Sequence, residues 1–316
     1  MRRWAGLFAV FATALAIVHV ACSSDEAAPD ESVPLPDRGA PEAAAPDVVV
    51  PADAGPPCDP KKPFGAPTRI PGLDAAVMVA TPRLSHDELT IYFTGREEAG
   101  SVARLMRARR TSLSAPFGPS EILTSPSSTS NDHDPSVSYD DQSLWFHSGR
   151  SGNADLYMAV KGAADFGAAT PISAVNTDAG EAHAYFWQSG SQLWFTSDRA
   201  SSWDIYTSTG KGFGPPKLVA ELSSTADDWQ PMITEDGLTT VFASNRDGGA
   251  GGYDLYVADR ADVGKPFGAP KRLAEASSPT NDFAGWISAD RCRLYFSSDR
   301  EAPGVRHAGY VAVRPR

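Results

Sequence analysis

Four acidic residues recur along the chain at steps of 49, 47 and 54 residues, and the residues beside them change from copy to copy. The acids are Asp132, Glu181, Asp228 and Asp282. The next position holds His133, Ala182, Trp229 and Phe283, and His183 lies one residue further on in the third copy. Carboxylates beside tryptophan suit sugars or cationic groups, and carboxylates beside histidine suit a metal ion. Apart from Ala182, these residues form the candidate binding site, to which we assign no metal and no other cofactor.

The shared acids also have a structural interpretation, in which they cap a turn by accepting hydrogen bonds from backbone amides. A second recurring set predicts charge-assisted pairs between adjacent strands, because each arginine precedes an aspartate by a few residues. The arginines of this set are Arg150, Arg199 and Arg246, and the aspartates are Asp155, Asp204 and Asp254. The glycine-rich stretch 247–252 has no phosphate-binding lysine, so we interpret it as a long hairpin.

The step between these residues reflects an internal repeat, marked twice in the sequence. A Phe-Gly pair recurs at Phe64, Phe117, Phe166, Phe213 and Phe267. An aromatic strand that ends in arginine recurs at Arg96, Arg150, Arg199, Arg246 and Arg300. Two markers with nearly the same step indicate five tandem copies of one unit of about 50 residues.

Each unit contains four short strands, and the second strand of each, such as 89–93 and 144–146, is apolar without alternation. Such a strand is covered on both faces, as happens where sheets pack radially. The segment 96–110 has helical propensity, but it occupies the position of the strand 155–160 in the second copy, so we predict a strand. The expected fold is therefore all-β, a five-bladed β-propeller of four-stranded antiparallel blades.

The two ends of the repeat region predict how the ring closes. The first Phe-Gly strand, 64–70, precedes the inner strands of any copy, and the last copy ends at Val313 without an outer strand. We expect the N-terminal strand to complete the last blade. Of the three cysteines, Cys58 lies just before that strand and Cys292 lies in the last blade, which predicts a disulfide across the seam.

The N-terminus resembles a bacterial lipoprotein signal. Residues 1–21 have a basic start and an apolar run, and VHVAC at 18–22 resembles a lipobox, which implies acylation of Cys22. The following stretch, 22–58, is rich in proline, alanine and acids and has no aromatic residue, so it predicts a disordered tether. The propeller would then occupy 59–316. Ser23 after the cysteine implies the outer membrane, on its periplasmic or cell-surface side.

The amino-acid composition and the motifs that are absent exclude some classes of partner, enzyme and fold. The formal net charge of -11 argues against nucleic acid, which requires a basic face. No G-x-S-x-G motif is present, and 27 glycines with 26 prolines exclude a mostly helical chain.

The repeats resemble those of the TolB-type, WD40-like propeller family. The resemblance rests on DPSVSYDDQSLWFHSGRSGNADLYMA from residue 134 and on PMITEDGLTTVFASNRDGGAGGYDLYVA from residue 231. Copies one and five are degenerate, with Arg104 and Ala308 in place of the aspartate of D-L-Y.

We therefore expect a monomeric, lipid-anchored scaffold without catalytic activity that binds an envelope protein or a glycan. The alternative is an enzyme similar to five-bladed glycoside hydrolases, with Glu181 as acid and Asp132 or Asp228 as its partner.

Overall fold

The computed structural model describes residues 58–316, except 74–77, 97, 99 and 305. The predicted signal peptide, Cys22 and the predicted tether up to residue 57 lie outside the described residues. Within the described part, no helix has the length and apolarity needed to cross a bilayer. All regular structure there is β, which confirms the predicted class.

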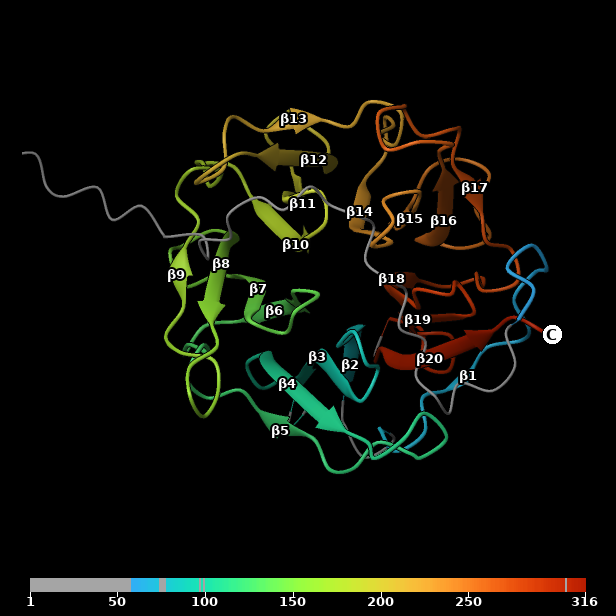
Figure 1. Ribbon diagram of the computed structural model, residues 1–316, viewed down its shortest axis with the longest axis horizontal. Helices are drawn as coiled ribbons and strands as arrows, with labels where there is room; N and C mark the ends of the chain where they lie inside the picture. Colours follow the sequence, from blue (N-terminus) through green and yellow to red (C-terminus); the bar gives the residue numbers. More distant parts are fainter. Residues whose placement is uncertain (1–57, 74–77, 97, 99, 305) are drawn as a thin grey trace, which may run out of the picture. The chain divides into compact units, whose positions relative to one another are not determined.

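Five four-stranded antiparallel sheets are arranged around a centre, each with its first strand innermost (Figure 1). The first blade contains β2 (Met78–Leu84), β3 (Thr90–Arg96), β4 (Arg104–Arg109) and β5 (Glu121–Ile122). The second contains β6 (Asp132–Val137), β7 (Ser143–Ser148), β8 (Asp155–Val160) and β9 (Thr170–Pro171), and the third contains β10 (Glu181–Trp187), β11 (Gln192–Ser197), β12 (Asp204–Thr209) and β13 (Lys217–Leu218). The fourth contains β14 (Asp228–Ile233), β15 (Thr239–Ser244), β16 (Asp254–Asp259) and β17 (Lys271–Arg272). The last contains β18 (Asp282–Ile287), β19 (Arg293–Ser298) and β20 (Ala308–Val313), completed by β1 (Thr68–Arg69).

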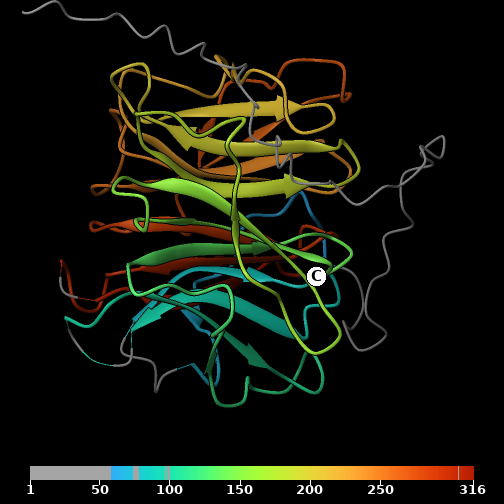
Figure 2. The ribbon, with the colours of Figure 1, turned by 90° about the vertical axis from the view of Figure 1, so that its left-hand side faces the viewer.

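The second strand of each blade is buried on both faces because neighbouring sheets pack against it face to face, as the side view shows (Figure 2). Phe93, Phe146, Phe195, Phe242 and Phe296 lie on these strands and are fully buried. The Phe-Gly motifs fill the outer part of the same interfaces. Phe213 packs edge-on against Trp145 of the preceding blade, and Phe267 packs in the same way against Trp194.

The structure confirms two local interpretations of the sequence. Residues 104–109 form the strand β4 because Leu105 and Ala108 are buried between β3 and the neighbouring blade, which outweighs their helical propensity. The glycine-rich stretch 247–252 connects β15 to β16 as a hairpin loop.

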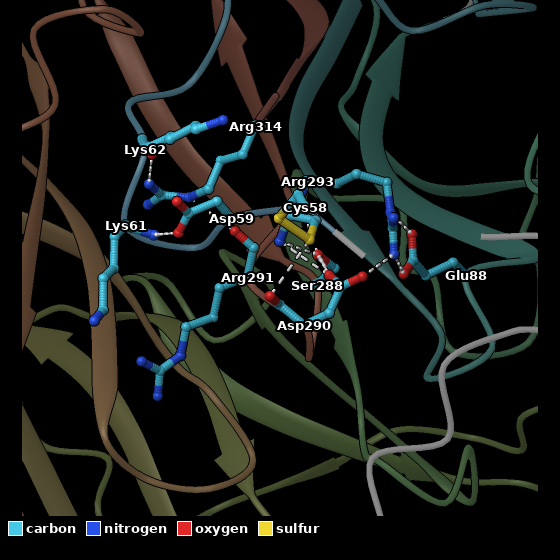
Figure 3. Close-up of a disulfide and its surroundings, with 11 residues drawn as sticks. Cys58, Asp59, Lys61, Lys62, Glu88, Ser288, Asp290, Arg291, Arg293 and Arg314 are labelled. Atoms are coloured by element: carbon cyan, nitrogen blue, oxygen red, sulfur yellow. Dashed lines mark hydrogen bonds and ion pairs between the residues drawn. A yellow bond between two sulfur atoms is a disulfide. The ribbon is translucent and has the colours of Figure 1, made fainter. Parts of the chain in front are cut away.

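The ring closes as predicted. β1 pairs antiparallel with β20, with Thr68 opposite Val311 and Arg69 opposite Tyr310, so the outer edge of the last blade is provided by the N-terminal segment. The seam is also cross-linked by a disulfide between Cys58 and Cys292, which lies among the hydrogen bonds of the β18–β19 hairpin (Figure 3). Disulfides of this kind are typical of proteins outside the reducing cytosol.

Each inner strand contains a β-bulge that shifts the register one or two residues after its start. Four of the bulge residues have positive φ, namely Thr81, Asp134, His183 and Gln230. The inner strand of the second blade begins at Asp132, before its bulge. The bulge directs these side chains differently from a regular strand, and it therefore determines which residues meet at the centre.

We predict that the disulfide makes a large contribution to the free energy of unfolding. A crosslink between residues separated by 234 positions removes conformational freedom from the unfolded chain, and the entropic model gives about 5 kcal/mol as an upper value. The double variant Cys58→Ser/Cys292→Ser should lower the free energy of urea-induced unfolding by several kcal/mol and expose residues 58–73 to hydrogen exchange. An unchanged unfolding midpoint in that variant, or in the reduced wild type, would contradict this account of the seam.

Candidate functional site

The predicted site acids belong to a repeated cluster that we call the arginine clip, which consists of an arginine, an acid and a serine or threonine. In the second blade, Arg150 donates from Nε to Ser148 Oγ at 2.9 Å and from Nη2 to Asp132 Oδ1 at 2.8 Å. Asp132 Oδ2 accepts the backbone N–H of Ser128 at 2.6 Å. The guanidinium lies over the rings of Phe146 and Tyr157, so one cation holds two strands and the preceding turn together.

The same clip recurs in the three later blades. In each, the arginine bonds the acid with Nη2 at 2.5–2.9 Å, and the acid accepts a backbone N–H four residues before it. The later pairs are Arg199 with Glu181, Arg246 with Asp228 and Arg300 with Asp282. The interpretation of these acids as turn caps therefore agrees with their hydrogen bonds.

The predicted pairing of these arginines with Asp155, Asp204 and Asp254 is wrong. Each arginine reaches back 18 residues to the inner strand, because its side chain crosses the aromatic pair between the strands. Asp155 and Asp204 instead accept hydrogen bonds from serines of the turn before the third strand, and Asp254 accepts backbone N–H groups of the glycine-rich hairpin.

The described residues of the first blade form no such clip. Val79 lies opposite Gly95 where Asp132 lies opposite Ser148, so Val79 occupies the position of the acids. Arg96 lies opposite Met78, one residue before the position of Arg150, so it is not the equivalent of the other marker arginines. The later copies share the acid and the arginine because these two residues form the clip, which the described residues of the first copy do not form.

The variable residues of the predicted site lie together at the mouth of the ring where the inner strands begin, which we call the funnel mouth. Here we define the aromatic arc as His133, His147, His183, Trp203, Trp229, Tyr253, Phe283 and His307. Successive ring centroids along the arc, from His133 through His147, His183, Trp229, Tyr253 and Phe283 to His307, lie 4.6–5.4 Å apart. Trp203 packs beside the line, 6.2 Å from Trp229. The arc extends over four blades and stops at the first, where Ala80 and Ala103 take the equivalent positions.

Four members of the arc were not identified from the sequence: His147, Trp203, Tyr253 and His307. The last three occupy one repeat position, just before the third strand, where the first two copies have Ala103 and Ala154. This position varies between copies as the predicted positions do, and that variation was the available signal. Only the folded ring brings it beside the start of the inner strand.

The histidine end of the arc surrounds a buried carboxylate, Asp134. Asp134 Oδ2 lies 3.2 Å from His183 Nε2 and 3.6 Å from His147 Nδ1. The opposite nitrogen of His183, Nδ1, lies 2.6 Å from Thr196 Oγ1, so a neutral ring that donates from Nε2 to Asp134 satisfies both contacts. Among the described residues, no group of three or more histidine, cysteine or acidic side chains is arranged to hold a metal ion.

Burial governs the protonation of this cluster. It lowers the pKa of His183 to about 4 and that of His147 to about 3, although the Asp134 carboxylate opposes both shifts. Burial acts on Asp134 in the opposite direction, but His183 and its neighbours outweigh it and hold the pKa of that carboxyl below its usual range. At neutral pH, the cluster thus consists of an ionised aspartate among neutral histidines.

Arg83 separates the funnel mouth from the other end of the ring. It extends from β2 and donates from Nη2 to Pro231 O of the fourth blade at 3.4 Å, and its guanidinium lies 5.2 Å from the ring centroid of Tyr185. Only 1% of Arg83 is exposed, and burial lowers its pKa to about 10, so it remains a cation at neutral pH. The centre of the ring is therefore filled by side chains.

Comparison with known proteins supports the fold. No family model and no curated protein sequence matches the chain. Among solved structures, the catalytic domain of a Coprinopsis cinerea GH62 α-L-arabinofuranosidase matches with a TM-score of 0.52 and 11% identity, over 80% of this chain and 97% of that one. A thermostable family-43 glycoside hydrolase matches with a TM-score of 0.52 and 10% identity, over 74% and 88%.

TolB from Acinetobacter baumannii is also similar, with a TM-score of 0.46 and 17% identity over 74% of this chain. The chain spans about half the length of that TolB, since the match covers 54% of it. At 10–11% identity, the matches to the two glycoside hydrolases show a shared fold and nothing more.

Breaking one arginine clip should destabilise the protein. Asp228→Asn leaves the Arg246 cation without its charge partner beside a fully buried position, and we expect a loss of about 3 kcal/mol in the free energy of unfolding. The matched control is Asp178→Asn, at an exposed turn residue, which should leave stability unchanged. If chemical denaturation gave equal stabilities for the two variants, Asp228 would not have the structural role assigned here.

The buried histidines predict a dependence of stability on pH. The pKa of His183 is lower in the folded protein than in the unfolded chain, so below about pH 6.5 the unfolded chain binds a proton that the folded protein excludes. The contribution of His183 to the free energy of unfolding is therefore complete above about pH 6.5. It decreases as the pH falls toward 4, with a loss of up to about 2 kcal/mol at pH 5.

His183→Gln tests this dependence, because Gln230 occupies the same bulge position in the fourth blade. Urea unfolding of this variant between pH 7 and pH 5 should show a shallower loss of stability than the wild type. Parallel pH profiles for the two proteins would show that His183 is not held neutral.

Proposed function

We propose that this protein is a non-catalytic binding module of the bacterial envelope that engages a glycan or a protein over its funnel mouth. The observation that carries the proposal is the aromatic arc, a set of half-buried rings collected from four different blades. Partly exposed aromatic rings provide contact area at a small cost in side-chain entropy, and they are enriched where proteins bind ligands.

The arginine clips favour binding over catalysis. Glycoside hydrolysis requires two carboxylates that face the substrate on either side of the scissile bond. Glu181, Asp132 and Asp228 are each fully buried and paired with an arginine. Asp134 is buried as well and is bonded to His183. These carboxylates stabilise the blades, and the partly exposed carboxylate beside the arc, Asp227, accepts a hydrogen bond from the Tyr253 hydroxyl.

The proposed location in the envelope rests on the resemblance of the N-terminus to a lipoprotein signal and on the disulfide at the seam of the ring. We propose that the protein is a lipoprotein of the outer membrane, anchored through Cys22, and that the stretch 22–58 tethers the propeller to the lipid. The disulfide supports export to an oxidising compartment. Cys58, the first described residue, is bonded to Cys292 in the β18–β19 hairpin, which lies at the end of the ring opposite the funnel mouth. We therefore propose that the tether joins the propeller at that end.

Removal of the central ring of the arc tests this function. The purified protein should bind at least one of oligogalacturonate, arabinoxylan and isolated bacterial sacculi, or a photo-crosslinker at position 203 should capture one discrete envelope protein in cells. Trp229→Ala should weaken that interaction at least tenfold, because it removes the ring that contacts Tyr253 and Phe283. Leu218→Ser, at an exposed outer-strand position, is the matched control and should bind normally.

Two results would contradict the proposal. One is the absence of any bound glycan or crosslinked protein. The other is release of reducing sugar from a bound glycan that disappears in a folded Glu181→Gln variant, which would establish the glycoside hydrolase alternative.

A further inference from the structure

The end of the ring opposite the funnel mouth contains a second concavity, which we call the hairpin pocket. It lies where the inner strands end, with a cavity volume of about 30 Å³. Tyr185, Met232 and Trp286 line it from the inner strands, and His86, Tyr139 and Glu235 line it from the hairpins that follow them. This volume holds about two water molecules, or the tip of one side chain.

The hairpins at this pocket share one internal hydrogen bond. In four blades a serine or threonine donates to an aspartate two residues later, as Ser85 does to Asp87 at 2.6 Å and Ser138 does to Asp140 at 2.7 Å. The residue between the two differs in every case: His86, Tyr139, Glu235 and Ala289. Because the flanking pair forms the turn, the middle residue is not needed for it, and all four middle residues line the pocket.

Glu235 gives the pocket a negative charge without a counter-ion. Its Oε1 accepts the backbone N–H of Ser189 at 2.7 Å and the Ser189 hydroxyl at 2.5 Å. Within the described chain, no lysine, arginine or histidine lies within salt-bridge distance of Glu235. The adjacent Asp236 is paired with Arg291 at 2.7 Å, so that arginine is already engaged.

The charged and titratable groups around Glu235 leave this charge uncompensated. Burial raises the pKa of Glu235, and Asp236 and Asp140 raise it further, as expected for a carboxylate that lacks a cation. Burial lowers the pKa of His86, whose ring lies 3.9 Å from that of Tyr139, so at neutral pH it adds no positive charge. Arg83 lies on the ring of Tyr185 and is bonded to Pro231 O.

We infer that the hairpin pocket binds the terminal ammonium of a lysine side chain presented by a partner protein. The Glu235 carboxylate is its counter-ion, and Tyr139 and Trp286 supply aromatic surface that attracts a cation. Ser189 already donates twice to Glu235 Oε1, so a bidentate guanidinium would compete with Ser189 for that oxygen, whereas a single ammonium would not. This site lies at the opposite end of the ring from the aromatic arc, so it does not depend on the function proposed above.

The test is a titration followed by the indole N–H signals of the tryptophans in nuclear magnetic resonance spectra of the purified protein. Nα-acetyl-lysine methylamide should shift the Trp286 signal with a Kd on the order of 1 mM. Nα-acetyl-norleucine methylamide has a similar stem without the ammonium and should cause no shift. Equal binding of the norleucine compound, or tighter binding of free cadaverine than of the lysine compound, would overturn the assignment to a lysine side chain.

Two variants separate the charge from the aromatic surface. Glu235→Gln keeps an acceptor for Ser189 and should weaken lysine binding about tenfold or more, and Tyr139→Leu should weaken it several-fold with Glu235 intact. Asp247→Asn, an exposed acid on the opposite end of the blades, is the matched control and should bind normally. Retention of full affinity in Glu235→Gln would overturn the inference, whereas the Trp229→Ala result would be unaffected.

Discussion

The fold depends on the closure of a ring whose two ends are distant in sequence. A sheet edge presents unpaired N–H and C=O groups, and the last blade would have such an edge if residues 68–69 did not pair with β20. Two paired residues are a short contact, and the Cys58–Cys292 disulfide adds a covalent link at the same seam. Because each blade packs against both of its neighbours, an open seam would also expose the apolar faces of the first and last blades.

Within the ring, charge is used mainly to hold strands together. Each arginine clip joins a cation, a buried acid, a backbone amide and two aromatic rings, and it fixes where the inner strand begins. The inner strand in turn carries the bulge that directs Asp134 and His183 toward the centre. The carboxylates with the most regular spacing therefore have a structural role, and the irregular positions beside them contribute rings to the aromatic arc.

The two ends of the ring differ in chemical character. The funnel mouth collects partly buried rings and neutral histidines around Asp134, whereas the hairpin pocket combines aromatic walls with a carboxylate that pairs with no cation of the described residues. Arg83 lies between them and fills the centre with a buried cation. The blades thus form one scaffold with two separate surfaces, each made of residues that the repeat does not require for folding.

The sequence by itself determined the number of blades, the strand 104–109, the closure of the last blade and the disulfide, because these follow from periodic residues and from the count of copies. It also identified half of the aromatic arc, since His133, Trp229 and Phe283 vary at one recurring position and His183 lies one residue beyond that position in its copy. Only the tertiary structure showed that Arg150 bonds Asp132 and not Asp155, and that Tyr253 and His307 join the arc. The reason is physical: strand pairing and the inner bulge set the direction of each side chain, and neither can be read from spacing along one copy.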